Sequence, residues 1–158
     1  MCAIVDANVG HQLFGNKPSE AGAYFLDWLT KGRGKLVVGS GLRQELEKSE
    51  KFKRLLLELV RANKAIDIQS REVIEATKAL QNEHICKSND QHVLALAKVS
   101  GARLLFTNDR ELQIDFKNRQ IIDGVQGRVY TTLRSTSVTR THKDLLRRRD
   151  LCGTQGSE

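Results

Sequence analysis

Short apolar runs alternate with longer segments of helical periodicity along this chain. The runs cover residues 2–5, 35–38, 65–68, 102–107 and 127–132. Each has the length of a strand, and the segments between them place apolar residues at the three- and four-residue spacings of a helix face. Strands that alternate with helices predict a parallel sheet covered by helices, which is an α/β fold.

Residues that favour helix ends mark several of the predicted helices. Pro18 fits the first turn of a helix, because its missing N–H is not needed there. Ser40 and Ser49 are each predicted to cap the helix that follows them. Gly101 is predicted to end the helix that begins near Asp90.

Four acidic residues lie near the ends of the predicted strands or on the helices that follow them. They are Asp6, Glu45, Asp90 and Asp109. In an open parallel sheet, residues just past the strand ends gather in one crevice. Four carboxylates in one crevice repel one another unless a cation lies among them, and a hard divalent metal meets this need. The pattern therefore predicts metal-assisted chemistry on phosphate.

Magnesium or manganese suits this site, because both prefer oxygen ligands and keep water positions open. Asp6 is the expected primary ligand, fixed by the first strand. Asp90 lies at a helix start, and Glu45 has a side chain long enough to bind metal directly or through water. Taken singly, each acid also has a structural interpretation: Asp109 as a helix cap, for example. Their joint placement favours the metal site.

The bulk composition describes a single domain. The chain has 158 residues, of which 39% are hydrophobic. No apolar stretch reaches the roughly 18–20 residues needed to span a bilayer, and the N-terminus shows no signal-peptide pattern. The three cysteines, Cys2, Cys86 and Cys152, are odd in number and far apart, so we expect three free thiols in a reducing, cytoplasmic compartment.

The positive charge is concentrated near the C-terminus. The net charge is +7, and residues 128–149 carry +6 of it, with seven lysines and arginines against one acid. A basic block of this kind attracts polyanions such as nucleic acid; a solvated tail that only aids solubility is the alternative. We therefore divide the chain into a compact domain, 1–133, and a basic C-terminal extension, 134–158.

The extension is expected to contain a linker rich in serine and threonine and a short basic helix around residues 143–151. The residues predicted to bind RNA are Arg134, Arg140, Lys143, Arg147, Arg148 and Arg149. Tyr130 is the one tyrosine, phenylalanine or tryptophan in the basic segment 128–149, so backbone phosphate contacts are expected rather than base stacking.

Four segments resemble those of PIN-domain nucleases. They are Ile-Val-Asp-Ala-Asn at 4–8, Gly-Leu-Arg-Gln-Glu-Leu at 41–46, Asn-Asp-Gln-His-Val-Leu-Ala-Leu-Ala at 89–97 and Gly-Ala-Arg-Leu-Leu-Phe-Thr-Asn-Asp at 101–109. The last two, in tandem, are the most specific, and the resemblance covers roughly residues 2–133.

This resemblance implies a three-layer α/β/α sandwich with a central parallel sheet. It also implies a ribonuclease site that depends on Mg²⁺ or Mn²⁺. The residues that match the family's acidic quartet are Asp6, Glu45, Asp90 and Asp109. By the same resemblance, Asn8 and Thr107 are polar neighbours that orient the carboxylates. Asp115, which follows this motif, is expected to be structural.

Several biological roles are open to a protein with this resemblance. Many small bacterial members of the family are toxins that cut RNA until an antitoxin partner covers the site, and others process ribosomal RNA or act in RNA decay. Homodimers are common among them. Two further alternatives remain: a catalytically inactive PIN-fold module that binds RNA or protein, and a nuclease that acts on DNA, since backbone phosphate contacts are alike for both nucleic acids.

Other phosphate-handling classes lack residues that they need. A haloacid-dehalogenase-like phosphatase requires a second aspartate where Asn8 stands, and a response-regulator receiver requires paired early acids and an aspartate after the third strand that the Asp67 segment does not supply. The chain has no glycine-rich phosphate loop of the P-loop type. The histidines lack metal-ligand spacing, and His92 is predicted to lie on a helix surface.

Overall fold

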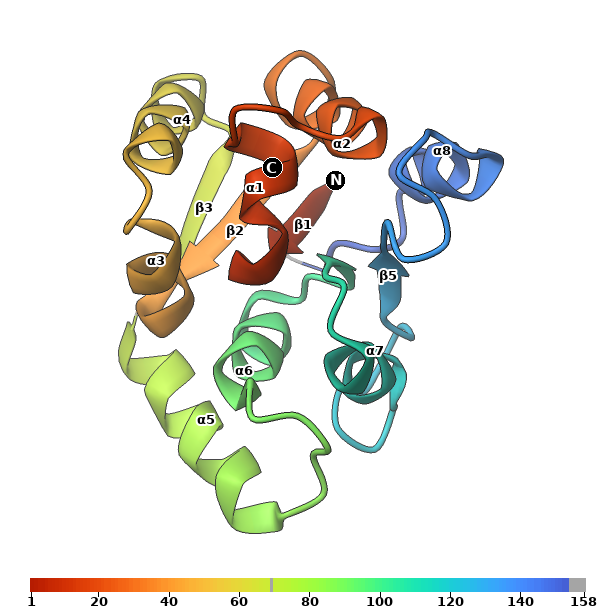
Figure 1. Ribbon diagram of the computed structural model, residues 1–158. Coiled ribbons are helices and arrows are strands. Elements are labelled where there is room, and N and C mark those ends of the chain that lie inside the picture. Colours follow the sequence, from red (N-terminus) through yellow and green to blue (C-terminus); the bar gives the residue numbers. More distant parts are fainter. Residues whose placement is uncertain (69, 154–158) are drawn as a thin grey trace.

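Five parallel strands form the centre of the protein in the computed structural model, which describes residues 1–68 and 70–153 except for the side chain of Ser40 (Figure 1). The strands are β1 (Cys2–Val5), β2 (Lys35–Gly39), β3 (Ala65–Ile68), β4 (Leu104–Phe106) and β5 (Arg128–Tyr130). Their order across the sheet is β3-β2-β1-β4-β5, and each neighbouring pair is parallel. The predicted α/β fold is confirmed.

Helices cover both faces of this sheet (Figure 1). They are η1 (Ala7–Val9), α1 (Gly10–Phe14), α2 (Glu20–Thr30), α3 (Ser40–Leu46), α4 (Glu50–Arg61), α5 (Ser70–Glu83), α6 (Gln91–Ser100), α7 (Arg110–Lys117) and α8 (Arg140–Arg147). Helix α1 packs on α2 and α4, and α2 also packs on α8, whereas α5 and α6 pack together on the other side. The α/β/α sandwich is thereby confirmed. None of the described helices is long and apolar enough to cross a membrane.

Two of the predicted helix boundaries are confirmed. The hydroxyl of Ser49 accepts a hydrogen bond from the backbone N–H of Phe52 at 3.2 Å, which caps α4. Gly101 ends α6 in the left-handed conformation, with φ of 82°. Glycine is favoured there because a Cβ atom is strained at positive φ.

Two other helix starts were wrong by one or two positions. Helix α2 begins at Glu20, after Ser19, whose hydroxyl accepts from a backbone N–H in the first turn, so Pro18 lies outside the helix. Helix α3 begins at Ser40 itself, and Gly39 occupies the cap position. Strand β2 runs directly into α3, which leaves no separate turn for a capping serine.

The strand register aligns the carboxyl ends of β1, β4 and β5. Val5 lies opposite Phe106, and Phe106 lies opposite Tyr130. The alignment continues one residue further, because the N–H of Asp6 donates to the carbonyl of Phe106 at 3.0 Å and that of Thr107 donates to Tyr130 at 3.2 Å. Strands β2 and β3 follow β1 on one side of it, and strands β4 and β5, later in the sequence, lie on its other side. This is the switch point at which open α/β sheets place their sites.

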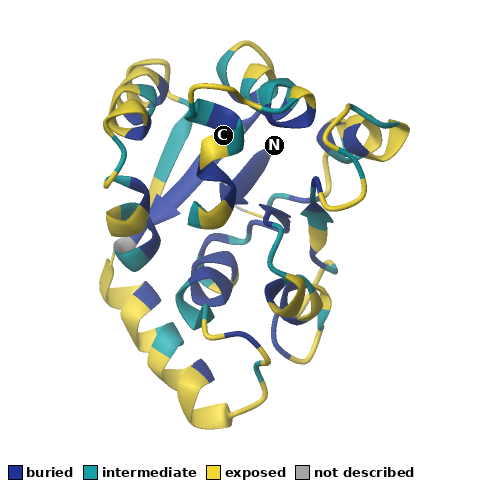
Figure 2. Cartoon of the chain, viewed as in Figure 1, coloured by how far each residue is buried: buried dark blue, intermediate teal, exposed yellow. Residues whose placement is uncertain are grey.

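A buried aromatic cluster holds the edge strand β5 to helix α2. The rings of Phe25, Phe106 and Tyr130 lie 4.8 to 5.1 Å apart, centroid to centroid. All three side chains are fully buried, as is most of the central sheet (Figure 2). The Tyr130 hydroxyl donates to the carbonyl of Ala21 at 2.6 Å, and burial raises the pKa of this phenol. The hydroxyl therefore remains a neutral donor.

Helix α8 packs against the body of the protein and begins at Arg140, earlier than expected. Thr139 and His142 form a capping box at its start. The His142 ring is buried, lies 4.6 Å from the Tyr130 ring, and bonds through Nε2 to the carbonyl of Thr131 at 2.7 Å. These contacts attach part of the basic segment to β5.

The chain beyond α8 closes on the amino ends of β1 and β4. A disulfide joins Cys2 to Cys152, with their Cα atoms 5.3 Å apart, and the N–H of Arg103 donates to the carbonyl of Leu151 at 2.7 Å. The prediction of three free thiols was wrong, and Cys86 is the free cysteine of the described residues. Sequence spacing gave no sign of a pairing that spans 150 residues.

Candidate functional site

Asp6 is the most buried of the four predicted acids. It follows β1 directly, is 6% exposed, and accepts a hydrogen bond from the Thr107 hydroxyl at 2.7 Å. Burial raises the pKa of Asp6, although the bond from Thr107 and the backbone N–H of Asn8 oppose this. Thr107 therefore lies where the resemblance placed it. Asn8 is exposed and faces Asp6 through its backbone.

Asp90 occupies the cap position of α6 without making a capping bond from its side chain. Its own N–H donates to the hydroxyl of Ser88 at 3.3 Å. Burial raises the pKa of Asp90, and the nearby charge of Asp6 raises it further. The backbone of Asp90 is thus held by Ser88, and its carboxylate is not used to cap α6.

Asp109 starts the helix that follows β4. Its Oδ1 accepts from the N–H of Leu112 at 3.1 Å, which makes it the side-chain cap of α7. Its backbone N–H donates to the hydroxyl of Thr107 at 3.1 Å. Thr107 therefore bonds to both Asp6 and Asp109 and couples the ends of two neighbouring strands.

Glu45 is carried by α3 and points toward α6. Its Oε1 lies 2.9 Å from Nε2 of His92, and both side chains are partly exposed. The predicted surface position of His92 is confirmed, but its contact with an acid of the site was not foreseen, because it joins residues 47 positions apart.

The four acids lie close enough to influence one another. The charges of Asp6, Asp109 and Glu45 all raise the pKa of Asp90, while His92 opposes them. Charges of one sign that face each other in a partly buried site destabilise the ionised form. The structure therefore brings the four acids near one another, and their role as metal ligands stays a prediction.

The donor chemistry of this edge fits a hard divalent cation, because all four groups offer carboxylate oxygens. Their present orientation does not chelate one: among the described residues, no three histidine, cysteine, aspartate or glutamate side chains are arranged to hold a metal ion. Glu45 is turned toward His92, and Asp109 is directed at its own helix. Burial is the main cause of the raised pKa values of Asp6 and Asp90, and the neighbouring carboxylates add to it, so positive charge at this edge would favour both ionised forms.

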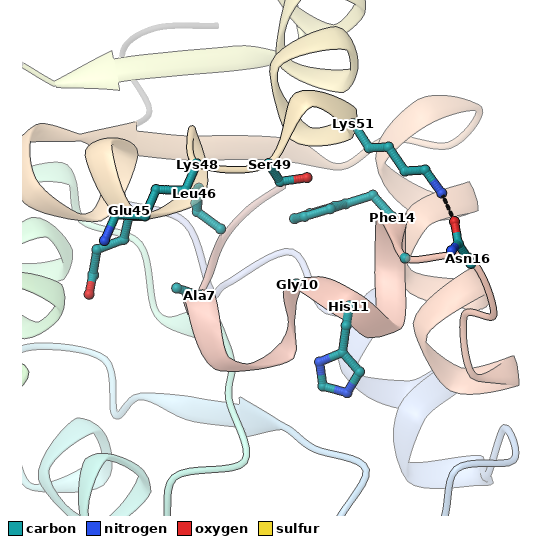
Figure 3. A pocket seen from close by; sticks show the side chains of 11 residues that line it. Ala7, Gly10, His11, Phe14, Asn16, Glu45, Leu46, Lys48, Ser49 and Lys51 are labelled. Atoms are coloured by element: carbon teal, nitrogen blue, oxygen red, sulfur yellow. Dashed lines mark hydrogen bonds between the residues drawn. The ribbon is translucent and has the colours of Figure 1, made fainter.

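A groove of about 430 Å³ opens beside this edge, between α1 on one side and α3 and α4 on the other (Figure 3). Glu45 stands at one end of it, and the ring of Phe14 lies further along. Lys48 and Lys51 line the α4 side, where Lys51 bonds to Asn16. Glu45 is the one of the four acids that lines this partly basic groove.

Asp115 supports the site although the sequence gave it no specific task. It is 1% exposed, and its carboxylate accepts from the backbone N–H groups of Lys87 and Ser88 at 2.8 to 2.9 Å. Ser88 in turn accepts from the N–H of Asp90. A structural role was expected for Asp115, and the structure specifies it: α7 anchors the loop that carries Asp90. Local sequence could not reveal these partners, which lie 27 and 28 residues earlier.

Asn108 and Gln113 also escaped the sequence analysis. The side chain of Asn108 bonds to Thr131 and Thr132 at 2.7 to 3.0 Å. Gln113 donates through Nε2 to the carbonyl of Thr107 at 3.0 Å and to the hydroxyl of Thr131 at 3.2 Å. Both residues fix the segment after β5 to the carboxyl edge.

The cations predicted to bind RNA have different surroundings. Arg140 and Lys143 are exposed on α8, where Arg140 lies 3.9 Å from Asp144. Arg148 is paired with Asp150 through two bonds, at 2.9 and 2.5 Å. Arg134 instead lines a cleft together with cations of the main body.

Comparison with known protein families agrees with the resemblance. The solved structure described as VapBC2 from Rickettsia felis bound to a DNA fragment from their promoter aligns at 19% identity with a TM-score of 0.49, covering 83% of this chain and 98% of that chain. No curated protein matches by sequence. The family described as PIN domain matches residues 3–117, which is most of the chain and includes all four acids. The chain belongs to the PIN domain family.

Proposed function

We propose that this protein is a metal-dependent endoribonuclease that hydrolyses RNA phosphodiester bonds at the carboxyl edge of β1 and β4. PIN domains are generally nucleases that use divalent metal ions. The observation that carries the proposal is the geometry at this edge: the Thr107 hydroxyl donates to the carboxylate of Asp6 and accepts from the N–H of Asp109, and Asp90 starts α6 close enough for their charges to act on it. Carboxylates gathered against their own repulsion are typical of a cation site.

In this proposal Asp6, Glu45, Asp90 and Asp109 hold Mg²⁺ or Mn²⁺. The metal supplies positive charge to the phosphate and lowers the pKa of a bound water. The chain itself provides rigidity. Asp6 is fixed by β1 and by the Thr107 hydroxyl, and Asp90 is fixed by the α6 start. Glu45 stands at the rim of the site, where its partner His92 keeps it within reach of α6.

The test is cleavage of a labelled single-stranded RNA in Mg²⁺ or Mn²⁺, compared with EDTA. We expect Asp6→Asn and Asp90→Asn each to lower the cleavage rate by at least about a hundredfold, as the loss of a metal ligand does. Asp27→Asn is the matched control, since Asp27 is an exposed acid on α2. Cleavage that survives in both variants would place the activity elsewhere or in a contaminant.

The same assay separates the two remaining alternatives. An inactive PIN-fold module binds RNA or protein without cutting it, so wild-type protein with metal would leave RNA and DNA intact. A DNA nuclease would cut a DNA strand of the same sequence and spare the RNA. The exposed cations of α8 and its flanks, Arg140, Lys143, Arg147 and Arg149, are proposed to assist RNA binding by charge alone, and this contribution would weaken steeply with salt.

A toxin role in a toxin–antitoxin pair, with an antitoxin or other protein partner, a possible homodimer and a cytoplasmic location, is proposed from the family resemblance. Expression would then arrest growth, and Asp6→Asn would relieve the arrest. Normal growth with active enzyme would favour RNA processing instead. Because a disulfide is present, the cysteine argument for a reducing compartment no longer supports the location. Fractionation of the cell would test it.

A further inference from the structure

A second cleft, of about 450 Å³, lies between α7, β5 and α8. Eleven described residues line it, and none of them is acidic. Lys117 from α7, Arg128 from β5 and Arg134 from the following segment bring three exposed cations to it. Lysine and arginine side chains that converge from separate elements, with no carboxylate among them, create a local positive field that attracts an anion.

The walls of this cleft are fixed by hydrogen bonds. His142 lines it and bonds to the carbonyl of Thr131, and its other ring nitrogen accepts from the N–H of Thr139 at 3.0 Å. The hydroxyl of Thr131 donates to the side chain of Asn108 at 2.7 Å. The cleft therefore exists because α8 folds back on β5, and it is held open before any ligand arrives.

The cleft and the acidic edge share one connecting residue. Gln113 lines the cleft, and its Nε2 donates to the carbonyl of Thr107. The hydroxyl of Thr107 is the group that bonds to Asp6. The cleft thus runs along β5 from Gln113 and Thr131, beside the acidic edge, to Arg128 at the amino end of the strand. A nucleic-acid strand held along β5 would place its phosphates between the acidic edge and these cations.

We propose that this cleft binds the sugar–phosphate backbone of the RNA strand whose scissile bond lies at the acidic edge. The inference rests on the proposed nuclease function and adds Lys117 and Arg128, from the main body, to Arg134. Phosphate oxygens pair with the three cations, and the neutral hydroxyl and amide groups of the walls donate or accept around the sugars. Because the contacts are made to the backbone, the cleft positions the strand and does not read its sequence.

The experiment uses the full chain in EDTA and a fluorescein-labelled single-stranded RNA of mixed sequence, with anisotropy measured over a range of salt concentrations. The triple variant K117Q/R128Q/R134Q removes the cations of the cleft. The matched triple variant R54Q/R61Q/K78Q removes the same charge from exposed positions on α4 and α5. All six side chains are exposed, so an unchanged melting temperature for both variants is expected and serves as the folding control.

We expect the cleft variant to bind roughly tenfold or more weakly at low salt. The slope of log affinity against log salt concentration should fall by about 2, since each neutralised phosphate of a single strand contributes about 0.7. The matched variant should keep a slope close to that of the wild type. Equal affinity and slope in the two triple variants would overturn the proposal. A second outcome would also overturn the proposal: the cleft variant binds RNA as the wild type does but no longer binds an oligo-glutamate peptide. The ligand of the cleft would then be an acidic protein segment.

A cleavage assay with Mg²⁺ distinguishes this proposal from the one on which it rests. If the wild type cuts RNA and the cleft variant binds and cuts it equally well, the cleft proposal fails and the nuclease proposal stands. If the wild type does not cut RNA, and the cleft variant binds RNA more weakly while the matched variant does not, the cleft stands as an RNA site and the nuclease proposal fails.

Discussion

The two ends of strands β1 and β4 differ in what gathers there: carboxylates at the carboxyl end, and chain-closing bonds at the amino end. At the carboxyl end, Asp6 and its acidic neighbours face one another, and burial and repulsion raise the pKa values of Asp6 and Asp90. At the amino end, the same strands are closed by the Cys2–Cys152 disulfide and by a backbone bond from Arg103 to Leu151. The carboxyl end therefore gathers carboxylates whose ionisation is opposed by burial and repulsion, whereas the amino end carries the disulfide and a backbone hydrogen bond.

Breaking the disulfide tests this contrast with the largest expected effect. Cys2→Ser, or reduction of the wild type, should lower the free energy of unfolding by about 2–5 kcal/mol, because the bond closes a very long loop in the unfolded chain. Urea titrations with and without reductant measure this, with Cys86→Ser as the control that retains the bond. Mg²⁺ affinity should hardly change while the protein stays folded. A parallel loss of Mg²⁺ affinity would show that the two ends are not independent.

Asp115→Ala should give the next largest effect, a loss of about 2–3 kcal/mol, because the buried N–H of Ser88 and the part-buried N–H of Lys87 lose a charged acceptor. This change acts on the support of the carboxyl end, so divalent-metal affinity should fall as well. Calorimetry of metal binding and thermal unfolding measure the two effects. Glu111→Ala, an exposed acid on the same helix, is the control and should alter neither. Lost stability with unchanged metal affinity would mean that Asp115 does not position Asp90.

Gly101→Ala should cost about 1–2 kcal/mol from its positive φ alone, and more because the new Cβ would lie 2.8 Å from the backbone of Gly153. Gly124→Ala is the matched control: its φ is +81°, and its Cβ would meet nothing within 4 Å. The difference between the two variants in urea unfolding isolates the closure of the amino end. Equal losses would indicate that the C-terminal segment contributes little there.

Asp90→Asn should have the smallest effect on stability and the opposite sign. The pKa of Asp90 is raised above its ordinary 3.8 in the folded protein, so ionisation weakens the fold. Below 3.8 both forms are neutral and the variant should match the wild type. As the pH rises from 3.8 through the raised pKa, the wild type loses stability and the variant does not, so the variant should have the higher melting temperature at neutral pH. Mg²⁺ should remove the advantage, and an advantage that is already present below 3.8 would argue against repulsion as its cause.

Local signals in the sequence were reliable where their partners lie nearby. Ser49 caps α4 through a residue three positions on, and Gly101 ends α6 by its own backbone freedom. The prediction failed at Ser40, because the register of β2 carries the strand directly into the helix. It also failed at Cys2 and Cys152, which lie 150 residues apart in the sequence. Whether two such residues meet depends on the fold of the whole chain between them.

The candidate site shows the same division. The strand-end position of Asp6 and the helix-start position of Asp90 follow from short patterns, so their shared edge was predictable once the sheet was known to be parallel. The contacts that hold them were not. Thr107 was inferred only through a family resemblance, and the pairing of Glu45 with His92 and the support from Asp115 involve residues far apart in the sequence.

By itself, the sequence determined the α/β alternation, the parallel sheet, the acidic residues at the strand ends and the concentration of positive charge in residues 128–149, because each depends on local periodicity or on composition. Only the tertiary structure decided that the basic segment folds back through α8, that Lys117 and Arg128 join Arg134 in one cleft, and that Cys152 closes on Cys2. Those outcomes depend on packing between distant segments, such as the burial of His142 against Tyr130, and local patterns in the sequence carry no record of such contacts.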